Sequence, residues 1–297
     1  MRVVVSCDAI AGLAAREASE VVARAFHDAG AQVAVSVLGA SGAALREALA
    51  PLPDVGLLVP ASVGDLRRQL DACAAGRYVV DLTGLEVGDL GAGLLEPIGE
   101  DPGAALAAAR EAWRGLELMA VVAEDEVSRP LTGLSGLAST AGRASGMDIR
   151  AVLAADAQAE AWLGRIGLPD HPGAGAAGGL GLLLAACGAT IQDGLSATAA
   201  LLDLAQTMRQ ADVVVTGSNL LDFHAVGGPL VKRVAAMGEE ALRPVVAVAG
   251  RNFVSARELR LSGIETVAAL VPASSTAEPS REDLVRVARQ VAATWTW

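Results

Sequence analysis

Short apolar runs alternate with alanine-rich amphipathic stretches at both ends of the chain. Runs of strand length occupy Val3–Ser6, Gln32–Leu38 and Val55–Val59 near the start, and Ala211–Thr216, Pro244–Ala249 and Thr266–Leu270 near the end. Helical spacing is found at Ala14–Ala29, Ser41–Leu49, Ser62–Ala74, Leu230–Ala241, Ser255–Leu261 and Ser280–Ala293. Because strands joined by single helices form right-handed βαβ units, both ends predict parallel sheet.

The middle of the chain is less regular. It predicts strands at Tyr78–Leu82 and Leu118–Ala123, a helix at Pro102–Trp113, a polar loop at Asp125–Ala144, and a helix at Asp148–Leu163 that Gly164 ends. We therefore predict an α/β protein. A doubly wound parallel-sheet domain of Rossmann or flavodoxin type is made from both ends, residues 1–75 plus 205–297, and a second α/β domain, residues 76–204, is inserted between them. A single continuous sheet is the alternative.

Composition narrows the function classes. The 297 residues are 53% hydrophobic, enough for a large core, and the net charge of −11 argues against nucleic acid and acidic membranes as partners. Cys7, Cys73 and Cys187 form neither a metal nor a disulfide pattern, so buried structural thiols are expected. The start, M-R-V-V-V-S-C-D, predicts a strand rather than a signal peptide, and no apolar run approaches the ~20 residues of a membrane span. We expect a cytoplasmic protein.

One segment is unusually rich in glycine. Pro172–Gly181, P-G-A-G-A-A-G-G-L-G, holds five glycines and three alanines ahead of an apolar run; we call it the glycine-rich segment. Exposed amides at a helix N-terminus bind anions such as phosphate, whereas small residues also allow two elements to pack closely. The spacing G-x-G-x-x-G fits a dinucleotide site poorly, because Pro169–Pro172 rather than a strand comes before it.

The glycine-rich segment, followed by C-G-A-T, closely resembles the glycerate kinase family, which phosphorylates D-glycerate with ATP. T-G-S-N-L-L-D resembles the family pattern T-G-E-G-x-x-D and keeps Thr216, Gly217 and Asp222. V-V-V-S-C-D-A-I-A-G resembles the family's opening strand and A-P-D-S-F-K-G and keeps Asp8 and Gly12. Residues at the carboxyl end of a parallel strand face the ligand crevice, so these residues are well placed.

Two middle segments carry the rest of the resemblance. Within Asp81–Gly99, the run G-D-L-G-A-G-L resembles N-D-G-G-A-G-x-L and keeps Asp89. Within Glu124–Gly136, R-P-L-T-G resembles N-P-L-T-G, with Arg129 in the asparagine position. Simpler interpretations stay open, because Asp89 could bond only its own turn, Arg129 could lie in a solvated loop, and Asp8 could cap a helix starting near Leu13.

The resemblance implies a set of site residues. Carboxylates for catalysis would come from Asp222, Asp89 and Asp8, of which Asp8 and Asp89 could hold Mg²⁺. Phosphate or substrate contacts would come from Gly173, Gly175, Gly178, Gly179, Thr216, Gly217 and Arg129. The implied cofactors are ATP and Mg²⁺ and the implied partner is a small organic acid, with a homo-oligomer left open.

Several charged positions of the family pattern are uncharged here. Alanine, serine or proline stands at Ala11, Ala40, Ala43, Ser218 and Pro229, and Lys232 is the single lysine. His224 lies outside the motif. Losing a group that stabilises transition-state charge costs about 10²–10³ in rate. Two hypotheses follow: a weak ATP-dependent kinase for D-glycerate or a similar hydroxy acid, or an inactive kinase-derived protein that binds a small anion or a partner. A nicotinamide-dependent oxidoreductase is a third, supported only by G-x-G-x-x-G.

Overall fold

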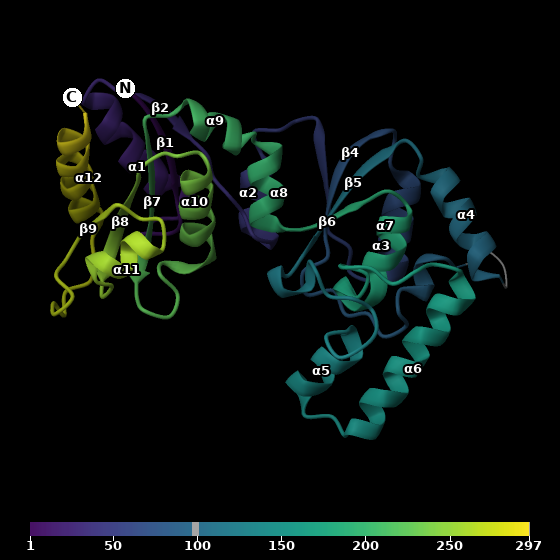
Figure 1. Ribbon diagram of the computed structural model, residues 1–297. Coiled ribbons are helices and arrows are strands. Elements are labelled where there is room, and N and C mark those ends of the chain that lie inside the picture. The colour runs from purple at the N-terminus through teal and green to yellow at the C-terminus, as the bar shows by residue number, and fades with distance from the viewer. Residues whose placement is uncertain (97–100, 297) are drawn as a thin grey trace. The chain divides into compact units, whose positions relative to one another are not determined.

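The computed structural model describes residues 1–96 and 101–296 and divides the chain into two compact units. Unit 1 comprises 1–38 and 198–297, and unit 2 comprises 39–197. Each unit has its own parallel sheet flanked by helices (Figure 1). This confirms the predicted α/β class with parallel sheets, and two separate sheets replace the alternative of one. The end of the 81–99 segment, 97–99, lies outside the described residues.

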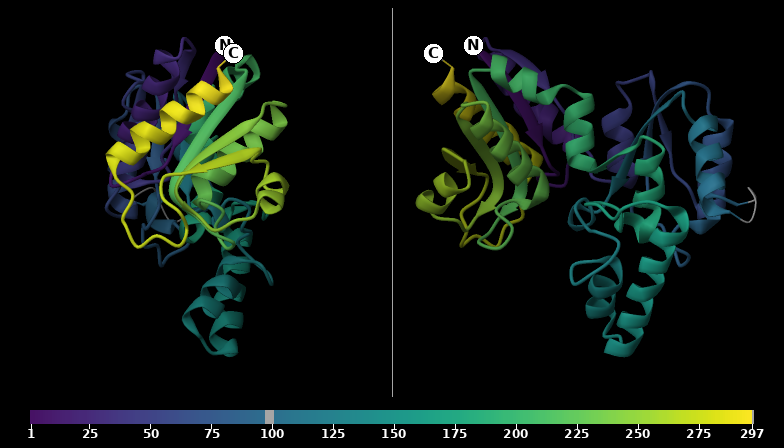
Figure 2. Two further views of the ribbon diagram at one scale, coloured as in Figure 1. Left: turned by 90° about the vertical axis from the view of Figure 1, so that its left-hand side faces the viewer. Right: turned by 45° about the vertical axis from the view of Figure 1, so that its right-hand side comes forward.

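Unit 1 holds a five-stranded sheet in the order β2-β1-β7-β8-β9. Its strands are β1 (Arg2–Cys7), β2 (Gln32–Val35), β7 (Val213–Leu221), β8 (Val245–Asn252) and β9 (Thr266–Ala269). Its helices are α1 (Ala15–Asp28), α9 (Leu204–Gln210), α10 (Gly228–Glu240), α11 (Ala256–Leu261) and α12 (Arg281–Trp295). Alternate β-branched residues let α1 and α12 cover one face, while α10 packs on the other (Figure 2).

Unit 2 holds a four-stranded sheet in the order β3-β4-β5-β6. Its strands are β3 (Val55–Leu58), β4 (Gly76–Asp81), β5 (Leu116–Val122) and β6 (Thr190–Asp193). Its helices are α2 (Gly42–Leu49), α3 (Val63–Ala72), α4 (Pro102–Ala112), α5 (Leu137–Ser145), α6 (Ile149–Ile166) and α7 (Leu180–Ala186), with 3₁₀ turns η1 (Ala92–Leu94), η2 (Glu124–Glu126) and η3 (Ala176–Gly179). Helix α8 (Gly194–Leu201) runs across the unit boundary.

The first predicted domain boundary is wrong. Residues 39–75 were assigned to the domain formed by the chain ends, but β3 pairs with β4, with Leu58 opposite Val80, and therefore belongs to unit 2. The apolar pattern of β3 predicts a strand but not its partner. The backbone at Ala40 also lies close to Gly194 of unit 2, because a Cβ on Gly194 would lie 1.9 Å from the carbonyl oxygen of Ala40.

Of the helix ends predicted from single residues, one is confirmed and one is wrong. Ser62 caps α3 as predicted, accepting a hydrogen bond from the Asp65 amide at 3.1 Å. Gly164 does not end its helix: α6 continues to Ile166 and ends at Gly167, which has a φ of +72°. Strand β6 has only four residues, and helices α8 and α9 are short. Their sequences show too little hydrophobic periodicity to be predicted.

The three cysteines are free thiols. Cys7 is buried in the unit 1 core, and burial raises its pKa to about 12. Cys187 is partly buried, and burial raises its pKa to about 11. Both thiols are therefore protonated near neutral pH. Only Cys7 is buried as expected, whereas Cys73 and Cys187 are partly exposed.

Candidate functional site

The residues singled out from the sequence fall into two groups. Unit 1 holds Asp8, Thr216, Gly217 and Asp222, and unit 2 holds Asp89, Arg129, Gly173, Gly175, Gly178 and Gly179. Each group is built from segments distant in sequence, so the fold does gather residues within each unit.

Asp8 and Gly217 are neighbours at the end of β1. The Asp8 amide donates to the Gly217 carbonyl at 2.8 Å, and the Asp8 carboxylate accepts from the Ala9 amide at 2.7 Å. Helix α1 is capped at Ala14, so Asp8 does not cap it. The carboxylate is held at the carboxyl edge of a parallel sheet, which is where ligands of such folds bind.

Thr216 does not stand at a strand end. Strand β7 continues to Leu221 alongside β8, so the prediction that placed the end of this strand at Thr216 is wrong. The side chain is fully buried, and its hydroxyl has no hydrogen-bond partner among the described residues. Gly217 is equally enclosed, since a Cβ there would lie 2.1 Å from the Val248 carbonyl oxygen.

Asp222 lies just beyond the end of β7. Its Oδ1 accepts hydrogen bonds from the amides of Ala225 at 2.7 Å and His224 at 3.0 Å. The Ala225 hydrogen bond, with further help from the His224 amide and the nearby Lys232 charge, lowers the pKa of Asp222. The carboxylate is therefore ionised at neutral pH, which suits cation binding better than proton abstraction.

At positions where the sequence departs from the family pattern, neutral groups form the local hydrogen bonds. The Ala11 amide donates to Asn219 Oδ1 at 3.0 Å, so two substituted positions meet across 208 residues of sequence. Ser218 is buried, and its hydroxyl donates to the Leu220 carbonyl at 3.0 Å. Pro229 lies in the first turn of α10, where it needs no amide hydrogen. These contacts leave no buried charge at the substituted positions.

The glycine-rich segment packs against two neighbouring loops. A Cβ on Gly175 would lie 2.3 Å from the Pro130 carbonyl oxygen, and one on Gly178 would lie 2.6 Å from Val87 Cβ. Within the segment, a Cβ on Gly181 would lie 2.0 Å from the Gly173 carbonyl oxygen. The close-packing alternative raised by the sequence therefore describes these glycines.

Several amides of the glycine-rich segment are hydrogen-bonded within the protein, where the sequence predicted exposed amides. Gly173 and Gly175 both donate to the Arg129 carbonyl at 3.0 Å. The Ala177 amide donates to Glu126 Oε2 at 3.1 Å, and Ala177 itself has a left-handed φ of +45°. A carboxylate of the chain thus accepts the hydrogen bond of an amide that lies between the predicted contacts Gly175 and Gly178.

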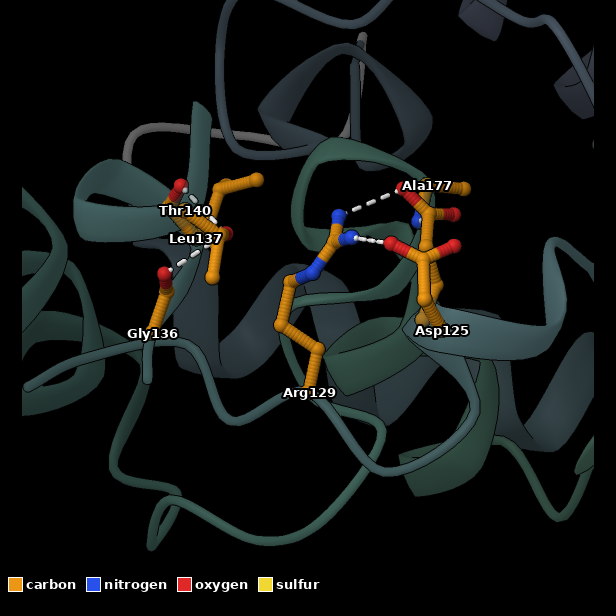
Figure 3. A network of polar contacts seen from close by, with 7 residues as sticks. Asp125, Arg129, Gly136, Leu137, Thr140 and Ala177 are labelled. Carbon is orange, nitrogen blue, oxygen red and sulfur yellow. Dashed lines mark hydrogen bonds and ion pairs between the residues drawn. The ribbon is translucent and has the colours of Figure 1, made fainter. Parts of the chain in front are cut away.

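Arg129 connects this carboxylate to a second one (Figure 3). Its Nη1 donates to Glu126 Oε1 at 2.6 Å and its Nη2 donates to Asp125, while Nε is buried without a partner among the described residues. The Arg129 side chain is only 13% exposed, so the alternative of a solvated loop arginine is wrong.

The Asp89 turn lies against the same segment. A Cβ on Gly179 would lie 3.0 Å from Leu90 Cα, which brings the two loops into contact. Asp89 accepts hydrogen bonds from the amides of Gly91 at 3.0 Å and Gly93 at 2.8 Å. Both carboxylate oxygens thus bond the turn itself. Unit 2 therefore brings together Asp89, Arg129 and the glycine-rich segment.

Sequence reasoning missed the carboxylate of Asp170, which ties the P-L-T-G loop to the start of the glycine-rich segment. It accepts from the amides of Leu131 at 2.9 Å and Thr132 at 3.0 Å and from the Thr132 hydroxyl at 2.8 Å. Burial raises the pKa of Asp170, but these hydrogen bonds together outweigh it, and the pKa is lowered. An aspartate just before His171–Pro172 was the available signal.

The side chains that could ligate a metal ion are few and separated. No three His, Cys, Asp or Glu side chains of residues 1–96 and 101–296 are grouped to hold a metal ion. Mg²⁺ in kinases needs only one or two protein carboxylates besides phosphate oxygens. Asp8 fits that requirement better than Asp89, because both oxygens of Asp89 already accept amide hydrogen bonds.

Comparison with known proteins settles the family. The model of the glycerate kinase family matches residues 72–296, about three quarters of the chain. The chain belongs to the glycerate kinase family. An uncharacterised protein of Mycobacterium bovis is 31% identical over 255 residues, covering 82% of this chain and 65% of that protein. A glycerate kinase of Bacillus subtilis is 28% identical over 252 residues, covering 75% of this chain.

The solved structure of a putative glycerate kinase 2 from Salmonella typhimurium LT2 has the same fold, with a TM-score of 0.69 at 20% identity. The match covers 99% of this chain and 98% of that chain. By contrast, the chain spans about 65% of the length of its Mycobacterium and Bacillus relatives. Among the described residues, no helix combines the length and apolar character required to cross a membrane.

Proposed function

We propose that this family member transfers a phosphoryl group from ATP to D-glycerate or a similar small hydroxy acid, and that it does so slowly. The family match over residues 72–296 carries the proposal. Several relatives of the chain are named glycerate kinase, including one from Bacillus subtilis.

The residues present support parts of this chemistry. Asp8, at a sheet edge and with only one oxygen hydrogen-bonded by the described residues, would hold Mg²⁺, which supplies positive charge to the moving phosphoryl group. Asp222 would orient the acceptor hydroxyl, and its lowered pKa makes it a weak proton acceptor. Asp89 is held by its own turn and would serve to shape the loop beside the glycine-rich segment.

Slow turnover follows from the missing cations. Lys232 is the single lysine, and Ala11 and Pro229 stand where the family pattern has lysine. The two groups that meet at Ala11 and Asn219, a backbone amide and a side-chain amide, are both neutral. The same observation favours a second candidate, an inactive kinase-derived protein that binds a small anion or a partner.

Phosphorus NMR of the full chain with Mg²⁺-ATP and D-glycerate tests the proposal. We expect a phosphoglycerate signal that Asp222→Ala loses. Asp222→Asn is the matched variant, since its amide oxygen can still accept the hydrogen bonds from His224 and Ala225 but carries no charge. No signal from a folded wild-type protein would contradict the proposal and favour the second candidate.

A further inference from the structure

Large apolar side chains are exposed at the start of helix α6 in unit 2. Met147, in the turn between α5 and α6, is 46% exposed. Ile149 and Leu153, in the first half of α6, are 65% and 62% exposed. Neighbouring apolar side chains left in water in this way mark interaction surfaces, whereas single exposed ones are common and need no explanation.

Helix α6 has one face in the core of unit 2 and the opposite face in solvent. It packs against α4 and α5 (Figure 1), and its buried residues are Val152, Ala159, Trp162 and Ile166. Exposed residues recur at intervals of three and four positions and therefore share the opposite side of the helix. This outer face of α6 comprises Arg150, Leu153, Ala157 and Glu160.

The outer face of α6 is complementary to itself. Its two charged residues are opposite in sign, and neither Arg150 nor Glu160 forms an ion pair with another described residue. When a second α6 crosses this face in the antiparallel direction, centred on Ala155, Arg150 of each copy lies level with Glu160 of the other. The same alignment places Leu153 of each copy level with Ala157 of the other, so a large side chain meets a small one.

We infer that two copies of this chain associate through the outer faces of their α6 helices, antiparallel about a two-fold axis near Ala155. A symmetric pair needs a surface that complements itself under one rotation, and this face does so in both charge and size. Association removes Leu153 from water, and the two Arg150–Glu160 pairs set the direction of the helices. A parallel pair would instead place arginine beside arginine and glutamate beside glutamate. The inference is independent of the proposed function.

Sedimentation equilibrium of the full chain at several protein concentrations tests the apolar part of this interface. We expect wild type to dimerise and Leu153→Glu to weaken the dimer about tenfold or more, because a carboxylate would enter the apolar contact. Leu242→Glu is the matched control. Leu242 is 88% exposed and follows α10 in unit 1, so its replacement should leave the dissociation constant unchanged. Circular dichroism confirms that each variant is folded.

A charge exchange tests the antiparallel arrangement. Arg150→Glu should weaken the dimer about tenfold or more, because two carboxylates then face each other at both ends of the helix pair. Adding Glu160→Arg to that variant should restore the affinity, since both pairs are formed again with their signs reversed. A wild type that is monomeric at every concentration would overturn the inference, as would a dimer that Leu153→Glu leaves intact. A double variant no tighter than Arg150→Glu would contradict the antiparallel alignment.

Discussion

Replacing Gly181 with alanine is expected to lower the free energy of unfolding by about 3 kcal/mol or more. The added Cβ would lie 2.0 Å from the Gly173 carbonyl oxygen and 3.1 Å from the Ala176 Cβ. Backbone cannot move aside as a flexible side chain can, and Gly173 is itself fixed by its hydrogen bond to Arg129. The segment must therefore shift as a whole. Urea denaturation of the full chain, followed by circular dichroism, measures the loss.

Gly164→Ala is the matched control for this substitution. Gly164 lies near the end of α6, and a Cβ there meets nothing within 4 Å. Alanine should stabilise the helix by about 0.5–1 kcal/mol, because glycine loses more conformational freedom on folding. Equal behaviour of the two variants would contradict the packing role assigned to the glycine-rich segment.

Replacing Glu126 with alanine is expected to cost about 2–4 kcal/mol of stability. The change leaves two groups without their acceptor: the Ala177 amide, and the Nη1 of Arg129, whose side chain is only 13% exposed. Asp125, on the outer side of the arginine, offers little compensation. Thermal and urea unfolding of the purified variant measure the cost.

Glu126→Gln separates the two contributions. Its amide oxygen can still accept from Ala177, but the guanidinium loses its partly buried counter-charge, so an intermediate loss is expected. Glu117→Gln removes a carboxylate from an exposed ion pair and should change stability by less than about 0.5 kcal/mol. A loss of stability at Glu117 as large as that at Glu126 would contradict the stabilising role assigned to the contacts around Arg129.

The sequence predicted the strands and helices with strong periodicity and the α/β class, because these depend on local patterns. It did not predict which sheet β3 joins, since Val55–Leu58 is a short apolar run that could pair with either set of strands. The four residues of β6 carried too weak a pattern to be recognised at all.

The candidate site shows a similar division. The glycine-rich segment could be located from its amino-acid composition, and its resemblance to the glycerate kinases indicated the family. Its hydrogen bonding could not be foreseen, because the acceptors come from Glu126 and Arg129, about fifty residues earlier in the chain. Likewise, no local pattern indicates that Ala11 and Asn219 meet.

The turnover number with saturating Mg²⁺-ATP and D-glycerate tests most directly the claim that this glycerate kinase family member lacks the cationic groups that speed phosphoryl transfer. Because each lost charge-stabilising group costs about 10²–10³ in rate, we expect less than about 1 per second. Kinases commonly turn over between about 1 and 100 times per second. A measured value of tens per second, lost in Asp222→Ala, would contradict the account and require cationic groups that these contacts do not reveal.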